Sequence, residues 1–376
     1  MAVVLAVFLD LVGFGIVVPQ LPLAAARFTT SGLVIGAVVA TDSLLSFLLA
    51  PAWGRLSDRI GRRPVILFGL AGSAIAYSVF GLAASLAVLF LARILSGSLG
   101  ATVNVAQAAL ADITPPEQRS RAMGLIGAAF GLAFTVGPAL GGIASRFGES
   151  APGLLAGGIC CLNFLIASAL LRESRTRRTQ DWGARVHVPL AALLVTFAAT
   201  LAFTAMYVVF QQYGTQALGL TRAGISYAFT LVGLVSVLVQ GRLVRRLAPR
   251  LGELRLVMWG GGLMTAGLGL LPFLAGLPKH GGVQVAGTGL SVVLLSAGFS
   301  LVGPCVAGFV SRTTPPDDQG RVLGTLQSIG SAARIVGPPL LGALADQGGF
   351  AAAFGLSALA AAAAGILAGK WKRLGN

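Results

Sequence analysis

Apolar residues run along this chain in stretches of about 20 positions, which short polar breaks separate. A helix of about 20 apolar residues is long enough to cross roughly 30 Å of hydrocarbon. The pattern therefore predicts twelve transmembrane helices, with expected bounds 2–26, 31–53, 64–84, 86–112, 121–146, 151–172, 188–213, 221–243, 253–276, 283–312, 321–345 and 349–370.

Composition agrees with this pattern. The 376 residues are 56% hydrophobic and 10% charged, with a mean hydropathy of +0.86. A soluble chain would carry charges at about a quarter of its positions. We expect an all-α membrane protein, and we interpret the first apolar run as a membrane helix rather than a signal peptide, because no basic segment precedes it and Asp10 interrupts it.

A formal charge of +15 could indicate nucleic-acid binding. The positions of the 27 basic residues show whether the charge serves nucleic-acid binding or membrane topology. When the breaks are assigned alternately to the two sides, 21 basic residues fall on one side and 4 on the other, while Arg93 and Arg334 lie inside spans. The basic side of a membrane protein is cytoplasmic, so both termini are predicted inside the cell. Binding of nucleic acid does not require this alternation, and we predict none.

The chain contains an internal repeat. A shift of 200 residues aligns 114–142 with 314–342, with 11 identities in 29 positions. The prediction is two parallel six-helix halves, residues 1–171 and 188–376, which a charged cytoplasmic linker at 172–187 connects.

The break after the second span reads GRLSDRIGRR, residues 54–63. Together with the two halves it resembles the major facilitator superfamily, whose signature loop reads G-x-L-x-D-R-x-G-R-R/K. The matching positions are Gly54, Leu56, Asp58, Arg59, Gly61, Arg62 and Arg63. Segments 9–22, 91–101 and 131–142 are similar to motifs of its twelve-span drug/proton antiporters, particularly tetracycline-type exporters. The resemblance implies a major facilitator fold with pseudo-twofold symmetry and transport by alternating access.

The same loop is interpreted in two ways. Its arginines are expected to set topology and to contact anionic headgroups, each worth about 1 kcal/mol. That role does not explain Asp58. The resemblance implies that Asp58 holds the cytoplasmic ends of the halves together, at the N-terminal end of span eleven, where a helix end favours a carboxylate. The corresponding segment of the second half, GRLVRRL at 241–247, has Arg245 in place of the acid.

Four ionisable residues fall inside predicted spans: Asp10, Asp42, Arg93 and Arg334. Each costs about 2.5–3.5 kcal/mol at the bilayer centre on insertion scales, so each is expected to face a cavity or a partner. Asp42 and Arg334 lie at similar depths in spans two and eleven, which face each other in this fold. We predict a pair between them, and the alternative is a separate partner for each within its own half.

For Arg93 the resemblance implies a role in proton coupling through a carboxylate, and the alternative is a structural hydrogen bond to carbonyls or to Gln20. Asp10 is either a proton carrier or a packing residue of span one. Tetracycline-type exporters also place an acid inside the second half, whereas spans seven to twelve have none in mid-span here. Proton coupling must then depend on Asp10 or Asp42, and this departure argues against tetracycline as the substrate.

Two further sets of residues complete the expected site. A helix-bending or close-packing motif is predicted at Gly137, Pro138, Gly141 and Gly142, and it recurs at Gly337 and Pro338. By family analogy the substrate cavity is lined from spans one, four, seven and ten by Gln20, Asn104, Gln107, Tyr207, Gln211 and Gln212, each of which could instead make an interhelical hydrogen bond.

The sequence shows no nucleophile-base set, phosphate-binding loop or metal-ligand cluster, so we expect neither an enzyme nor a bound cofactor or metal. The predicted function is proton-coupled export of a small amphipathic organic compound. The alternative is a proton-independent facilitator or importer of a metabolite, sugar or ion. We expect a monomer in the cell's inner membrane, with a small-molecule substrate and membrane lipids as its partners.

Overall fold

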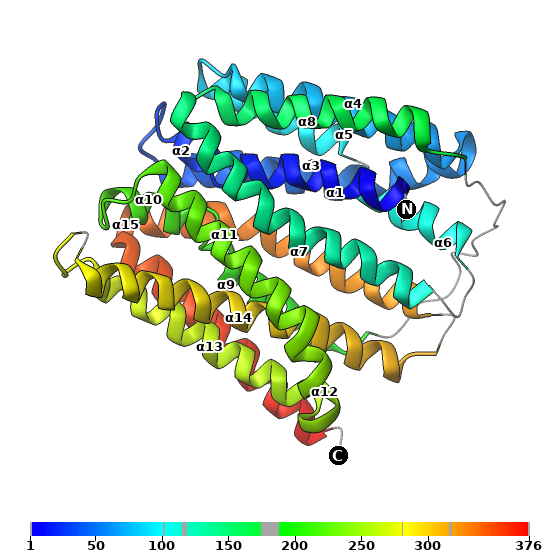
Figure 1. Cartoon of the computed structure of the whole chain (residues 1–376). Coiled ribbons are helices and arrows are strands. Elements are labelled where there is room, and N and C mark those ends of the chain that lie inside the picture. The colour runs from blue at the N-terminus through cyan, green and yellow to red at the C-terminus, as the bar shows by residue number, and fades with distance from the viewer. Residues whose placement is uncertain are drawn as a thin grey trace. The chain divides into compact units, whose positions relative to one another are not determined.

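The structure of the chain is a computed structural model that describes residues 2–100, 102–114, 119–173, 188–279, 281–315 and 318–374. Apart from short turns and breaks, these residues are helical, and they contain no strand (Figure 1). The helices are α1 (Ala2–Val17), α2 (Leu21–Ala25), α3 (Gly32–Ile60), α4 (Arg62–Gly81), α5 (Leu86–Leu99), α6 (Thr102–Ile113), α7 (Arg119–Ala144), η2 (Ser145–Phe147), α8 (Ala151–Leu170), α9 (Leu190–Thr204), α10 (Val209–Gln216), α11 (Arg222–Leu238), η3 (Val239–Val244), α12 (Arg245–Leu251), α13 (Glu253–Leu274), α14 (Gly282–Thr313) and α15 (Gln319–Leu374).

Every predicted span is occupied by helix, and ten described helices are long and apolar enough to cross a membrane. The difference from twelve has two physical causes. Helix α1 is only 16 residues long. Helix α15 runs for 56 residues and covers both of the last two predicted spans; its Gly349, at φ 74°, interrupts the helical backbone between them. Left-handed backbone of this kind is readily adopted only by glycine.

Three predicted spans consist of two helices each. The first breaks between α1 and α2, where Pro19 cannot donate a backbone hydrogen bond. The fourth breaks at Gly100, between α5 and α6, and the seventh breaks at residues 205–208, between α9 and α10. Spans one and seven occupy corresponding places in the two predicted halves, and both are interrupted.

Contacts divide the chain into two compact units. The first contains residues 1–29, 41–181 and 222–233, and the second contains 30–40, 182–221 and 234–376. Each unit thus holds most of one predicted half together with a short helical segment of the other. The predicted linker stays a prediction, because most of it, 174–187, lies outside the described residues.

Within the first unit α1 packs on α7 and α8, and α4 packs on α8 and α5 (Figure 1). Within the second unit the strongest packing joins α13 to α14 and α15, and α15 to α9. Small residues allow this close packing. A Cβ atom added to Gly137 of α7 would lie 2.8 Å from Cα of Gly15 in α1. Such contacts are typical of helix pairs in membranes.

Candidate functional site

A buried ion pair lies in the first unit, between α3 and α5. Arg93 Nη2 is 3.2 Å from Asp42 Oδ2, and the Ser96 hydroxyl donates to Asp42 Oδ1 at 2.5 Å. The side chain of Arg93 is 4% exposed and that of Asp42 is 15% exposed. The helices approach closely here because Gly97 faces Asp42, and a Cβ atom on Gly97 would lie 2.5 Å from the Asp42 carbonyl oxygen. Arg93 therefore binds the carboxylate of Asp42, and the role in proton coupling that the resemblance implies for Arg93 stays a prediction.

Asp10 lies in the same unit, buried in α1 with 8% exposure. Ser73 of α4 is its hydrogen-bonding neighbour, and Oδ1 of Asp10 has no hydrogen-bond partner among the described residues. Asp42 lies close enough to Asp10 for the two charges to interact. A buried oxygen without a partner is rare in folded proteins and marks a group that merits a functional test.

Arg334 lies half-buried in α15, in the second unit, where its guanidinium donates to the Ser331 hydroxyl at 3.0 Å. Tyr207 is an electrostatic neighbour of Arg334. Asp42 belongs to the first unit, so the predicted pair between Asp42 and Arg334 stays a prediction. The structure gives Asp42 a partner within its own half, which is the alternative for that residue.

The signature loop between α3 and α4 is organised around Arg62. Its guanidinium contacts Asp58 at 2.7 Å, Asp112 at 2.9 Å and the Ser57 hydroxyl at 2.6 Å. Asp112 comes from the end of α6 and its side chain is 12% exposed, whereas that of Asp58 is 48% exposed. One guanidinium thus joins the ends of α3, α4 and α6. The predicted role of Asp58 as a latch is not tested by these contacts.

A second carboxylate fixes the start of α4. Glu173 accepts hydrogen bonds from the backbone N–H groups of Arg62 at 2.7 Å and Arg63 at 3.2 Å. These are helix N-terminal groups, which favour a negative charge. Gly61, at φ 107°, makes the turn, and a Cβ atom on it would collide with the Glu173 carboxylate. Arg63 also donates to the Ser168 carbonyl at 2.7 Å, whereas Arg59 is exposed.

Gly54, the first position of the loop, has no atom within 4 Å of an added Cβ. Its place in the signature is not explained by packing within the described part of the chain.

The glycine-proline motifs lie in close helix contacts. Gly141 of α7 faces the backbone of Ile16 in α1, and Gly142 faces Ser226 in α11. In the second unit Gly337 faces the side chain of Thr204 in α9. Pro138 and Pro338 lie inside α7 and α15, each of which continues through its proline. The close-packing role is thus visible in both units.

The predicted cavity residues fall into two classes. Gln20 is buried, and its amide donates to the Ser226 hydroxyl at 2.8 Å. Gln211 and Gln212 of α10 are also buried, and Nε2 of Gln212 has no hydrogen-bond partner within the described chain. The half-buried Tyr207 packs edge-on against Phe203.

The other two predicted cavity residues, Asn104 and Gln107, are exposed on α6. They lie three residues apart on one helix and so share a face.

A carboxylate just beyond the eleventh predicted span binds the start of α3. Asp346 of α15 accepts hydrogen bonds from the backbone N–H groups of Gly32 at 2.7 Å and Leu33 at 3.1 Å, and from the Ser31 hydroxyl at 3.2 Å. One helical turn before Asp346, Gly342 packs directly against the backbone of Gly32. This cluster, within the second unit, is hereafter the outer cap: Ser31, Gly32, Leu33, Gly342 and Asp346.

Comparison with known families agrees with the motifs and the fold. The model of the Major Facilitator Superfamily matches residues 3–338 and 250–374. The chain belongs to this superfamily. Its members are membrane transporters and not enzymes, so the transporter class and the multi-pass membrane fold are confirmed.

Relatives of this transporter include a tetracycline resistance protein. It is 30% identical to "Tetracycline resistance protein, class E" of Escherichia coli over 349 residues, which cover 88% of the chain and 84% of the relative. It is 32% identical to "Major facilitator superfamily domain-containing protein 10" of Bos taurus over 337 residues, which cover 81% of the chain and 71% of the relative.

Among solved structures, the human organic anion transporter MFSD10 matches with a TM-score of 0.73 at 24% identity, over 98% of both chains. A bacterial homologue of the iron transporter ferroportin matches with a TM-score of 0.76 at 18% identity, over 98% of this chain and 97% of the other. Both show the fold of this transporter and, at such identities, nothing beyond it.

Sequence reasoning missed Ser96, Asp112, Glu173 and the partners of Asp346. Each makes a hydrogen bond through a side-chain or backbone polar group, with a residue at least 50 positions away. The small number of acidic residues in the sequence could have pointed to these contacts. The chain has only 12 acidic residues, so each one near a cluster of arginines is a candidate partner.

Proposed function

We propose that this transporter exports a small amphipathic organic compound in exchange for protons, by alternating access. The observation that carries the proposal is the buried carboxylate of Asp10 and the half-buried carboxylate of Asp42, together with Arg93 in one unit. Buried ionisable groups in membrane segments are costly, and they mark ion and proton pathways.

Asp10 suits a proton carrier because protonation removes a charge that its buried site stabilises only in part. Its Oδ1 atom has no partner among the described residues, and a protonated carboxyl group needs fewer hydrogen-bond donors around it than a carboxylate does. Asp42 suits the same role in a different way. Its protonation would release Arg93, a buried cation that then needs another acceptor. Either event changes the packing of the helices that carry the pair.

The substrate class rests on the interrupted spans. Spans one and seven both break beside buried glutamines, Gln20 in the first unit and Gln211 and Gln212 in the second. Paired interruptions at corresponding places of the two halves point to the binding site of a transporter. Amide side chains carry no fixed charge, so they fit a weakly charged, amphipathic compound.

The relatives support export of such compounds. Several are named tetracycline resistance proteins, and one from Bacillus subtilis (strain 168) is named "Multidrug resistance protein 2", at 28% identity over 360 residues.

The alternative, a proton-independent facilitator or importer, is favoured by one observation: predicted spans seven to twelve contain no acidic residue in mid-span. The distribution of arginines supports a cell membrane location with both termini inside, and we propose a monomer.

Two carboxylates are proposed as conformational latches. The resemblance assigns Asp58 to the cytoplasmic side. As a latch, its carboxylate would leave Arg62 and bind the N-terminal end of span eleven. Asp346 already binds an N-terminus, that of α3, in the outer cap. We infer that the two latches act at opposite ends of spans two and eleven.

The test has two stages. A thermal-shift screen across chemical classes first identifies a compound that stabilises the purified protein. Proteoliposomes with an imposed pH gradient then report whether that compound and protons move in opposite directions. Substrate movement that ignores the gradient, in wild type and in Asp10→Asn and Asp42→Asn alike, would favour the facilitator.

A further inference from the structure

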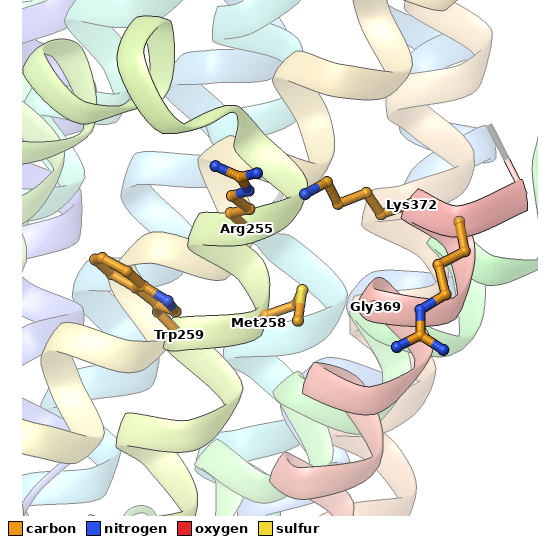
Figure 2. Close-up of a pocket in the computed structure, with 6 residues that line it drawn as sticks. Arg255, Met258, Trp259, Gly369 and Lys372 are labelled. Atoms are coloured by element: carbon orange, nitrogen blue, oxygen red, sulfur yellow. The ribbon is translucent and has the colours of Figure 1, made fainter. Parts of the chain in front are cut away.

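A basic cavity of about 430 Å³ lies in the second unit, between the start of α13 and the end of α15 (Figure 2). Its walls are Arg255, Met258, Trp259, Gly369, Lys372 and Arg373. In Figure 2 the Lys372 side chain reaches from α15 toward the guanidinium of Arg255 on α13. Two cations from different helices thus converge on one space, and none of these residues belongs to the transport site proposed above.

The positive charge of the cavity is not neutralised within the described part of the chain, where Arg255, Lys372 and Arg373 form no ion pair. An acidic residue beside the cavity, Glu253, is buried and is bound by Arg312 in an adjacent hollow that Arg255 and Lys372 also line. Like charges held together in this way repel each other, so the cavity stabilises an anion that occupies it.

The space lies where α13 and α15 are in contact only through the side chain of Met258. Deeper in the pair the backbones meet, and a Cβ atom on Gly261 would lie 2.7 Å from Cα of Gly365. One turn further along α15, Gly369 carries no side chain and faces only the flexible end of Met258, at 3.4 Å from a Cβ position. A larger residue at 369 would fill the cavity.

The cavity also has an exposed wall of large apolar side chains. Met258 and Trp259 are 39% and 56% exposed, although they lie near the start of a helix that is apolar enough to cross a membrane. Tryptophan concentrates at the boundary between hydrocarbon and headgroups, and basic pockets between membrane helices on the cytoplasmic side bind lipid headgroups. We propose that this cavity binds the phosphate headgroup of an anionic phospholipid, with the acyl chains along Met258 and Trp259.

Quenching of tryptophan fluorescence by brominated lipids tests the proposal at the site itself. In full-length protein with Trp53, Trp182 and Trp371 replaced by Phe, Trp259 is the single reporter. Vesicles contain brominated phosphatidylglycerol or brominated phosphatidylcholine in an unbrominated background. We expect phosphatidylglycerol to associate at least about tenfold more strongly, since each basic residue contributes about fivefold.

The triple variant Arg255→Gln/Lys372→Gln/Arg373→Gln should lose this preference. A matched control, Arg245→Gln/Arg246→Gln/Arg250→Gln, removes the same charge from α12, outside the cavity, and should keep it. Gly369→Leu should also abolish the preference, by filling the space with all charges intact, and it decides the question if the triple variant does not fold.

Three results would overturn the proposal. They are equal association of the two lipids, equal losses in the two triple variants, or an unchanged preference in Gly369→Leu. Sodium phosphate in place of chloride, at constant ionic strength, separates the two sources of phosphate. If it removes the preference, the cavity takes a free anion and the lipid assignment is wrong; an unchanged preference supports the lipid.

Discussion

The ion pair between Asp42 and Arg93 predicts a large coupling free energy in a double-mutant cycle. Asp42→Asn keeps an oxygen for the Ser96 hydroxyl but leaves the Arg93 cation, 4% exposed, without its carboxylate. Breaking one side of a buried pair costs about 3–5 kcal/mol. The 15% exposure of Asp42 puts the expected loss at the lower end, about 3 kcal/mol in the free energy of unfolding.

Arg93→Gln should cost about 2 kcal/mol, because Ser96 still stabilises the Asp42 carboxylate, which has some access to water. The double variant contains two neutral amides, and we expect it to lose only about 2 kcal/mol in total. The coupling between the two positions is then about 3 kcal/mol, at the upper end of measured values.

Unfolding in mixed micelles of detergent and denaturing surfactant gives the four free energies of the cycle. The ion pair would be refuted as a source of stability if the losses from the two single substitutions sum to the loss from the double variant, within about 0.5 kcal/mol. The cycle of Asp42→Asn with Arg334→Gln is the comparison. A coupling of similar size there would support the pair that the depths of the two residues predict.

Three further predictions concern the latches and the signature loop. Asp346→Asn should speed hydrogen exchange of the Gly32 and Leu33 amides about fivefold, since a lost helix cap costs about 1 kcal/mol. Unchanged exchange would show that Asp346 does not cap α3. Asp58→Asn should leave insertion and topology intact but impair transport, and normal transport would reduce the loop to a topological anchor. Gly61→Ala should lower the free energy of unfolding by about 1–2 kcal/mol, because φ is 107° there and a side chain strains such a backbone. The control Gly54→Ala, whose added Cβ lies in open space, should not lower it. Equal effects of the two substitutions in thermal unfolding would contradict backbone strain at Gly61.

The membrane spans were predictable because their length and composition suffice to identify them. All twelve apolar stretches are helical. The breaks within them were not predicted, since apolar composition continues through residues 205–208, where the chain turns between α9 and α10. Nor did the sequence reveal that 30–40 and 222–233 pack in the unit of the opposite half, because that assignment depends on contacts between distant helices.

The site was predictable in its residue types but not in its pairs. The cost of a charge in hydrocarbon identified Asp10, Asp42 and Arg93 without any structure. The partner of Arg93 depends on which helix faces α5, and depth alone placed Asp42 opposite Arg334. The contact of Arg62 with Asp112 spans 50 positions of sequence and has no local signal.

The central claim, that substrate and protons move in opposite directions, is tested most directly in inside-out vesicles with an acidic lumen. Vesicles with purified protein should accumulate the compound from the thermal-shift screen, and a pH-sensitive dye in the lumen should report proton loss as the compound enters. Asp10→Asn, Asp42→Asn or both should abolish the accumulation while the compound still binds. Equal uptake with and without the gradient, and no proton movement on addition of the compound, would contradict proton-coupled export.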